Sequence, residues 1–326
     1  MLPVAGSKGR QSMKRSANLF VHAVTGNAHV EQLNLSLRFL KHFSRQDILV
    51  VAARYDSKIE HDQVVRIDVP ERFDNHQASI LMKTGLHRIV GDTERICCYL
   101  DSDVVAVNSG VDRIFQRKRG PVTFAADHTR LPMFSRYAVR CSCVRGSCDH
   151  LRQAIGSKFG VDVFDPEWQH WNGGVFLFDS GSMDFLDTWH TYTRAIFDDP
   201  GWKTRDQGTL IATVWKFGLQ NQQTLAPKYN YIVDGMRGMA DFERASASPS
   251  SYRVDTTYSL DPASPLLRPY FLHFINGCGG MQGWHNWDEA EARLAHSQSF
   301  AARHLAACGA TPRRRGVADA PKTAGG

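Results

Sequence analysis

The stretch ICCYLDSDVVAV, residues 96–107, is a continuous apolar run that ends in two aspartates one residue apart. Such a run is typical of a strand buried on both faces of a parallel sheet. Ligands of open α/β sheets bind beyond the carboxyl ends of the strands, so Asp101 and Asp103 are expected to face a site. Two carboxylates there suit a hard divalent cation, Mg²⁺ or Mn²⁺, of the kind that holds a diphosphate. The alternative is that they cap a turn after the strand.

Strand-like apolar runs alternate with helix-period stretches from Leu19 to about Asn221. This alternation predicts an α/β fold with a mostly parallel central sheet flanked by helices. Strands are predicted at Leu19–Val24, Ile48–Ala52, 64–69, Ile96–Leu100, 121–126, 173–178 and Tyr270–Phe274. Helices are predicted around Leu33–Leu40, over 77–90, around Phe185–Ile196 and Leu210–Trp215, and from Trp287 to Leu305. Residues 222–268, rich in Pro, Ser and Gly, predict a long loop region.

The charge of the chain is concentrated at its ends. Its 326 residues carry a net charge of +6, of which residues 1–18 contribute +4 and residues 311–326 contribute +3, leaving −1 for 19–310. A nearly neutral body argues against a nucleic-acid partner. We therefore expect a single domain over 19–310 between two basic disordered tails, which offer at most weak contact with an anionic membrane surface.

The lack of a recognisable targeting signal and the cysteine usage favour a cytoplasmic protein. The inner membrane surface is its only expected membrane contact. The sequence has no uninterrupted apolar run of about 18 residues, as a membrane-spanning helix needs. The first residues lack the apolar segment of a secretory signal. Seven cysteines spread over the chain do not form the pattern of a disulfide framework.

Five segments, in order, extend this picture: VHAVTGN at 21–27, YLDSDVV at 99–105 after a helix that bears Lys83, WNGGVFLFD at 171–179, DQG at 206–208, and HF at 273–274 before GGMQGW. Together they resemble glycosyltransferases of the GT-A fold, and in detail family 8, which includes glycogenin and bacterial galactosyl- and glucosyltransferases. PVTFAADH at 121–128 and APKYN at 226–230 are weaker matches. The resemblance covers roughly residues 19–285, and an ordered set of motifs is more specific than any one of them.

The resemblance implies where the donor nucleotide and its metal bind. Residues expected at the donor nucleotide are Thr25, Asn27, Lys83 and Ser102. Residues expected to ligate Mn²⁺ or Mg²⁺ are Asp101, Asp103 and His273. From the residue pattern alone, Lys83 could be a solvated side chain at the edge of its helix, and His273 a hydrogen-bonded core residue.

The resemblance also implies which residues face the transferred sugar. These catalytic candidates are Asn172, Asp206 and Gln207, with Asp206 holding sugar hydroxyls and Gln207 near the anomeric carbon. The glycines after Asn172 would let the backbone approach a ligand closely, although a bulge would explain them equally well. Asp206 could instead be an ordinary first-turn residue of its helix.

One motif departs from the family pattern. The family has a lysine shortly after the histidine, in a K-P-W run that neutralises the diphosphate, whereas this chain reads HFINGCGGMQGW. Backbone N–H groups around Gly277, Gly279 and Gly280 could form an anion nest in its place. The alternative is a substitute cation, for which the candidates are Lys203, Lys228 and His285.

A cysteine cluster stands apart from these motifs. Cys141, Cys143, Cys148 and His150 offer three soft ligands and an imidazole, which would suit tetrahedral zinc. Their spacing is not a common zinc signature, and free thiols often serve as small apolar residues. Cys97 and Cys98, inside an apolar strand, are expected in the core.

The resemblance thus implies a metal-dependent enzyme that moves a hexose from a nucleotide sugar, UDP-glucose or UDP-galactose, to an unidentified glycan, lipid or protein acceptor with retention of configuration. Two other functions stay open. One is a sugar-nucleotide nucleotidyltransferase, although VTGNAHV lacks the basic Gly-rich loop typical of that class. The other is a catalytically silent protein that binds nucleotide sugars or other proteins.

Overall fold

The computed structural model describes residues 18–91, 94–143, 147–233 and 269–275, and the backbone alone of three short strands, β9 (Phe242–Glu243), β10 (Ser251–Arg253) and β11 (Leu266–Leu267). Contacts group Met1–His285 into one compact unit, which holds every described residue, and Asn286–Gly326 into a second. The predicted tails, apart from Asn18, the helix from Trp287 and the glycine-rich stretch after Ile275 lie outside the described residues. The single domain over 19–310 stays a prediction.

Six strands form the central sheet, in the order β3-β2-β1-β4-β7-β6. They are β1 (Asn18–Thr25), β2 (Asp47–Ala53), β3 (Val64–Arg66), β4 (Ile96–Leu100), β6 (Val122–Ala126) and β7 (Trp171–Phe178). β3, β2, β1 and β4 pair in parallel, whereas β7 is antiparallel to both β4 and β6. This confirms the predicted mostly parallel sheet.

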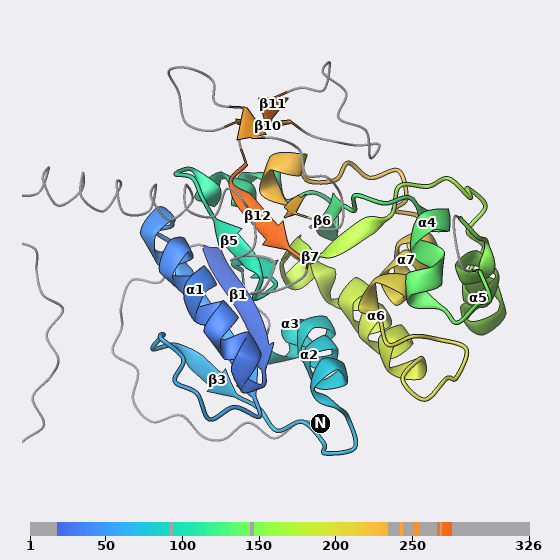
Figure 1. Ribbon diagram of the computed structural model, residues 1–326, viewed down its shortest axis with the longest axis horizontal. Helices are drawn as coiled ribbons and strands as arrows, with labels where there is room; N and C mark the ends of the chain where they lie inside the picture. The colour runs from blue at the N-terminus through green and yellow to red at the C-terminus, as the bar shows by residue number, and fades with distance from the viewer. Residues whose placement is uncertain are drawn as a thin grey trace, which may run out of the picture. The chain divides into compact units, whose positions relative to one another are not determined.

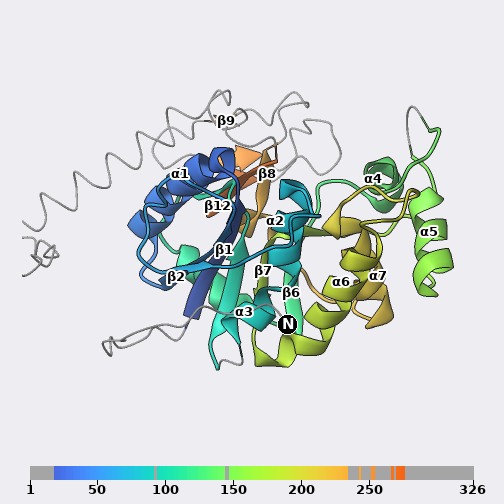
Figure 2. The ribbon, with the colours of Figure 1, turned by 90° about the horizontal axis from the view of Figure 1, so that it is seen from below.

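Helices cover both faces of the sheet (Figures 1 and 2). Successive residues of a strand point to opposite faces, and every residue of β1 after Asn18 is buried. Val21 belongs to the core shared with α2 (Asn75–Thr84), α6 (Met183–Ala195) and α7 (Asp206–Lys216). Phe20, on the opposite face, contacts the ring of Phe115. α1 (Asn27–Phe43) packs against β1 with Leu33, Leu37 and Leu40 buried, as its apolar spacing predicted.

Two predicted elements differ in extent. The helix expected over 77–90 is divided into α2 and α3 (Leu86–Val90) at Gly85. A Cβ at Gly85 would lie 2.9 Å from the Leu81 carbonyl oxygen and 3.3 Å from His190 Cε1, so the chain turns where only glycine fits. The strand expected over 64–69 ends at Arg66, because its pairing with β2 stops at Ala52, one residue before β2 ends.

A second sheet, in the order β5-β12-β8, lies next to the end of β4. β5 (Val104–Ala106) follows the two aspartates directly, and β12 (Phe271–Phe274) pairs antiparallel to it and parallel to β8 (Tyr231–Val233). The register sets His273 opposite Val104, and Figure 1 shows β12 beside β5. This sheet therefore brings a residue 170 positions away in the sequence to the aspartate pair.

Several short elements were not predicted. They include α4 (Leu131–Ala138), α5 (His150–Phe159) and three 3-10 helices, η1 (Val111–Arg117), η2 (Ser180–Ser182) and η3 (Pro227–Tyr229). Within the described part of the chain, no helix has the length and apolar character that crossing a membrane requires.

Candidate active site

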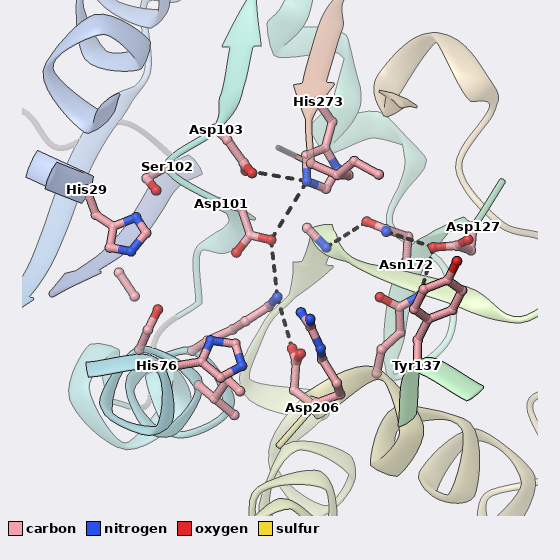
Figure 3. A pocket seen from close by; sticks show the side chains of 18 of the residues that line it. His29, His76, Asp101, Ser102, Asp103, Asp127, Tyr137, Asn172, Asp206 and His273 are labelled. Atoms are coloured by element: carbon pink, nitrogen blue, oxygen red, sulfur yellow. Dashed lines mark hydrogen bonds and ion pairs between the residues drawn. The ribbon is translucent and has the colours of Figure 1, made fainter. Parts of the chain in front are cut away.

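A pocket of about 630 Å³ lies at the carboxyl ends of β1, β4 and β6, where the sequence predicted a site. Its volume falls in the range of about 300–1,000 Å³ that is usual for small-molecule sites. Acidic groups reach it from three places, the β4–β5 turn, the end of β6 and the start of α7 (Figure 3). Predicted residues that line it are Thr25, Lys83, Asp101, Ser102, Asp103, Asn172, Asp206, Gln207 and His273.

Backbone hydrogen bonds hold the aspartate pair in place. The Asp101 N–H donates to the Gly174 carbonyl of β7 at 2.9 Å, and the Asp103 carbonyl accepts from the Phe274 N–H of β12 at 2.9 Å. Val104 N–H donates to the Asp101 carbonyl at 3.1 Å and closes the turn. The pair thus occupies a turn, as the alternative interpretation held, and this turn directs both carboxylates toward His273.

Asp101, Asp103 and His273 offer ligand atoms that all lie within 4.8 Å of one another. His273 Nε2 is 3.4 Å from Asp103 Oδ1 and 4.0 Å from Asp101 Oδ2. Burial alone would lower the pKa of His273, but the charges and hydrogen bonding of Asp103, with a further contribution from Asp101, raise it above its ordinary value. The site therefore favours a positive charge between these three side chains.

The chemistry of this group fits a divalent cation. The amide NH₂ of Asn230 donates to Asn172 Oδ1 at 3.1 Å, so Asn230 Oδ1 serves as the acceptor, 3.0 Å from His273 Nδ1. With its proton on Nδ1, His273 directs the lone pair of Nε2 toward the aspartates. Asp103 Oδ1 is buried, and apart from its ion-pair contact with His273 it has no hydrogen-bond partner among the described residues. These are the ligand types and the orientation that Mn²⁺ or Mg²⁺ needs.

Lys83 connects the aspartate pair to α7. Its Nζ lies 3.2 Å from Asp101 Oδ2 and 2.9 Å from Asp206 Oδ2, and the side chain is 9% exposed. Burial alone would lower the pKa of Lys83, but the two carboxylates raise it above its ordinary value. The alternative of a solvated Lys83 is therefore wrong, and Lys83 is a buried cation that positions two acidic groups.

Asp127, at the end of β6, is a site residue that the sequence reading missed. Its Oδ2 accepts hydrogen bonds from Asn172 Nδ2 at 3.0 Å and from Gln207 Nε2 at 2.7 Å. Burial would raise its pKa, but His170 and His128, together with the hydrogen bonds from His128 and Asn172, hold that pKa well below its usual range. Asp127 is thus an ionised anchor that fixes the two amides predicted to face the sugar.

The glycines after Asn172 make room for side chains of the site. A Cβ on Gly174 would lie 2.2 Å from His273 Cε1, and one on Gly173 would lie 3.2 Å from both Lys83 Nζ and Asp206 Oδ2. The pairing of β6 with β7 also shifts register between Phe124 and Ala125, so the bulge of the alternative interpretation is present.

Other predicted residues lie elsewhere. Asn27 is exposed and does not line the pocket, because its side-chain oxygen accepts hydrogen bonds from the Asp56 and Ser57 N–H groups. Lys203 and Lys228, proposed as substitutes for the family lysine, also lie outside its lining: Lys203 Nζ donates to the Arg136 carbonyl, and Lys228 Nζ lies over the rings of Tyr229 and Tyr270.

Unlike Lys203 and Lys228, the cation Arg205 lines the pocket, and it was not predicted from the sequence. Gly277, Gly279, Gly280 and His285, the remaining candidates for binding the diphosphate, lie outside the described residues. His29, His76 and Tyr137 also line the pocket (Figure 3).

Comparison with known proteins identifies the architecture. No protein family model and no curated protein matches the sequence. Among solved structures, galactosyltransferase LgtC in complex with donor and acceptor sugar analogs is similar over 86% of this chain and 95% of LgtC, with 15% identity and a TM-score of 0.51. The chain has a GT-A fold. The expectation drawn from the ordered motifs is therefore confirmed for the fold.

Two further matches are more distant. The WbbM bifunctional glycosyltransferase is similar over 87% of this chain, with 12% identity and a TM-score of 0.49, and the chain spans about half, 53%, of its length. Mouse xyloside xylosyltransferase 1 is similar over 67% of this chain and 88% of its own, with 11% identity and a TM-score of 0.42.

Proposed function

We propose that the chain is a divalent-metal-dependent glycosyltransferase, which moves a hexose from a nucleotide sugar, UDP-glucose or UDP-galactose, to an acceptor hydroxyl. The observation that carries the proposal is the convergence of Asp101, Asp103 and His273 in a GT-A fold, beside a second acidic group at the start of α7. Retention of configuration is part of the proposal and rests on the resemblance to family 8.

The reaction separates charge, and the pocket has groups for both ends. Breaking the bond between the anomeric carbon and the diphosphate leaves negative charge on the β-phosphate and positive charge on the sugar. A divalent cation held by Asp101, Asp103 and His273 would neutralise the diphosphate and act as a Lewis acid toward the leaving group. Arg205, exposed in the pocket lining, adds a second positive charge for the phosphates.

The sugar end would be served by the network around Asp127. Asp206 offers a carboxylate that can accept hydrogen bonds from sugar hydroxyls and stabilise positive charge at the anomeric carbon. Asn172 and Gln207 are held by Asp127, so their amides need little reordering when the sugar binds. Lys83 holds the Asp206 side chain in place by the ion pair at 2.9 Å.

The partners follow from this chemistry. A nucleotide sugar would be the donor, and the acceptor would be a glycan, lipid or protein that presents a hydroxyl. The nearly neutral body of the chain argues against a nucleic acid. Basic residues near both ends could add weak attraction to an anionic membrane surface, consistent with a cytoplasmic protein at the inner membrane.

The experiment that tests the proposal is turnover of a panel of nucleotide sugars, with free nucleoside diphosphate as the readout. Slow donor hydrolysis is expected with a UDP-hexose in Mn²⁺ and none in EDTA, because water can replace the acceptor while the cation cannot be omitted. A nucleotidyltransferase would instead release pyrophosphate from UTP and a sugar 1-phosphate. A silent binding protein would bind UDP and turn over nothing, and either of these results would overturn the proposal.

A further inference from the structure

The loop between α4 and α5, together with the first residue of α5, contains a second cluster of potential metal ligands, separate from the pocket. Cys141, Cys143, Cys148 and His150 each offer one ligand atom, and the four atoms lie within 4.8 Å of one another. None of the described residues that line the pocket belongs to this cluster. The four residues are not adjacent in the sequence, so the fold of this segment is what brings their side chains together.

Two distances inside the cluster match the edges of a tetrahedral zinc site. Zn–S bonds of about 2.3 Å and Zn–N bonds of about 2.0 Å give tetrahedron edges of about 3.8 Å between sulfurs and about 3.6 Å between sulfur and nitrogen. Cys141 Sγ and Cys148 Sγ are 3.9 Å apart, and Cys143 Sγ and His150 Nδ1 are 3.7 Å apart. A disulfide would need about 2.05 Å between sulfurs, and all three cysteines are free.

Hydrogen bonds to α4 hold Cys148 in place. Cys148 Sγ donates to Ser135 Oγ of α4 at 3.2 Å, and the same oxygen accepts from the Leu151 N–H at 2.9 Å. The Cys148 N–H donates to the Pro132 carbonyl at 3.0 Å and ties the loop to α4.

We propose that Cys141, Cys143, Cys148 and His150 bind one structural zinc ion. Four protein ligands close the coordination sphere, so the ion has no open position for a substrate. Its binding would release the thiol protons of the three cysteines and would involve no change of oxidation state. The ion would join the segment after α4 to the start of α5. Phe134 and Tyr137 of α4 line the pocket, so the ion would thereby stabilise one wall of the site.

The test is the zinc content of the purified full-length chain, measured by plasma mass spectrometry after dialysis against metal-free buffer. About one zinc per chain is expected for the wild type, and about a tenth of that or less for Cys143→Ser and for His150→Ala. Two control variants should keep the zinc. One is Cys308→Ser, at a cysteine that is not part of the cluster, and the other is Asp103→Asn, in the pocket. Wild type without zinc, or cluster variants that retain it, would overturn the proposal.

A second measurement on the wild type covers the case in which the variants fail to fold. Replacement of zinc by Co²⁺ should produce thiolate-to-cobalt charge-transfer absorption and the visible bands of a tetrahedral ion. Removal of the zinc by a chelator should make the three cluster thiols reactive toward a thiol reagent, in addition to the thiols that react while zinc is bound. A cobalt protein without thiolate bands, or a Cys141–Cys148 disulfide found by mass spectrometry of the freshly purified chain, would contradict a zinc site.

Discussion

Asp103→Asn is expected to reduce donor turnover at least about a hundredfold while the fold stays intact. The substitution removes a negative charge from the ligand group but keeps the size of the side chain. The main described side-chain contact of Asp103 Oδ1 is the one at 3.4 Å from His273 Nε2, so the native bonding lost with the charge is this one ion pair. We therefore expect the melting temperature in EDTA to change by less than about 3 °C.

The measurement is donor hydrolysis over a range of Mn²⁺ concentrations, with Asp68→Asn, an exposed aspartate outside the pocket, as the matched control. The control should keep wild-type turnover. If Asp103→Asn turns over donor at the wild-type rate in micromolar Mn²⁺, Asp103 is no metal ligand. A large loss of melting temperature would instead assign it a structural role.

Lys83→Met is expected to cost about 3 kcal/mol of unfolding free energy in EDTA, in addition to most of the turnover. Removing one partner of a buried ion pair costs about 3–5 kcal/mol, because the remaining charge has no counterion. The lower end applies, since Asp101 and Asp206 are 28% and 14% exposed and keep part of their hydration. Both carboxylates would then face each other without the cation that now lies between them.

Chemical denaturation measures this cost, with Lys58→Met as the control at an exposed lysine. The double variant Lys83→Met/Asp206→Asn should recover part of the lost stability, because it removes one of the two uncompensated charges. Equal stability of Lys83→Met and wild type would show that the ion pairs contribute nothing. Failure of the double variant to recover any stability would assign the loss to packing.

Periodicity was sufficient to predict the central sheet and its main helices. β4 matched its predicted bounds, since a strand buried on both faces has a continuous apolar sequence. The reversed direction of β7 could not be predicted, because a buried strand has the same composition in either direction. α4 and α5 were missed because each is short, although Leu151, Ile155 and Phe159 do recur at helical spacing.

The site was predictable wherever a residue lies in a strand, or directly after one, within a recognisable motif. Asp101, Asp103 and His273 were found in this way and converge in the structure. Asp127 also follows a strand, yet a single aspartate after a strand is a common pattern. Its role depends on hydrogen bonds from segments 45 and 80 residues away, which no local pattern reveals.

Asn27 shows the opposite error. It belongs to a matching motif, but its side chain supports the loop after β2 instead of facing the pocket. Arg205 was missed because it precedes the motif residues Asp206 and Gln207, and only the folded structure brings its guanidinium to the pocket lining.

Binding of UDP to wild type and His273→Ala, measured by calorimetry with Mn²⁺ and again with EDTA, tests the metal-dependent site most directly. His273→Ala should weaken binding about tenfold or more in Mn²⁺ and leave it unchanged in EDTA, because the lost contact to the nucleotide runs through the metal. His42→Ala, at a half-buried histidine of α1 outside the pocket, should match the wild type in both conditions. Equal losses for His273→Ala with and without Mn²⁺ would show that His273 only packs or hydrogen-bonds, and would contradict the assignment of Asp101, Asp103 and His273 as a metal site.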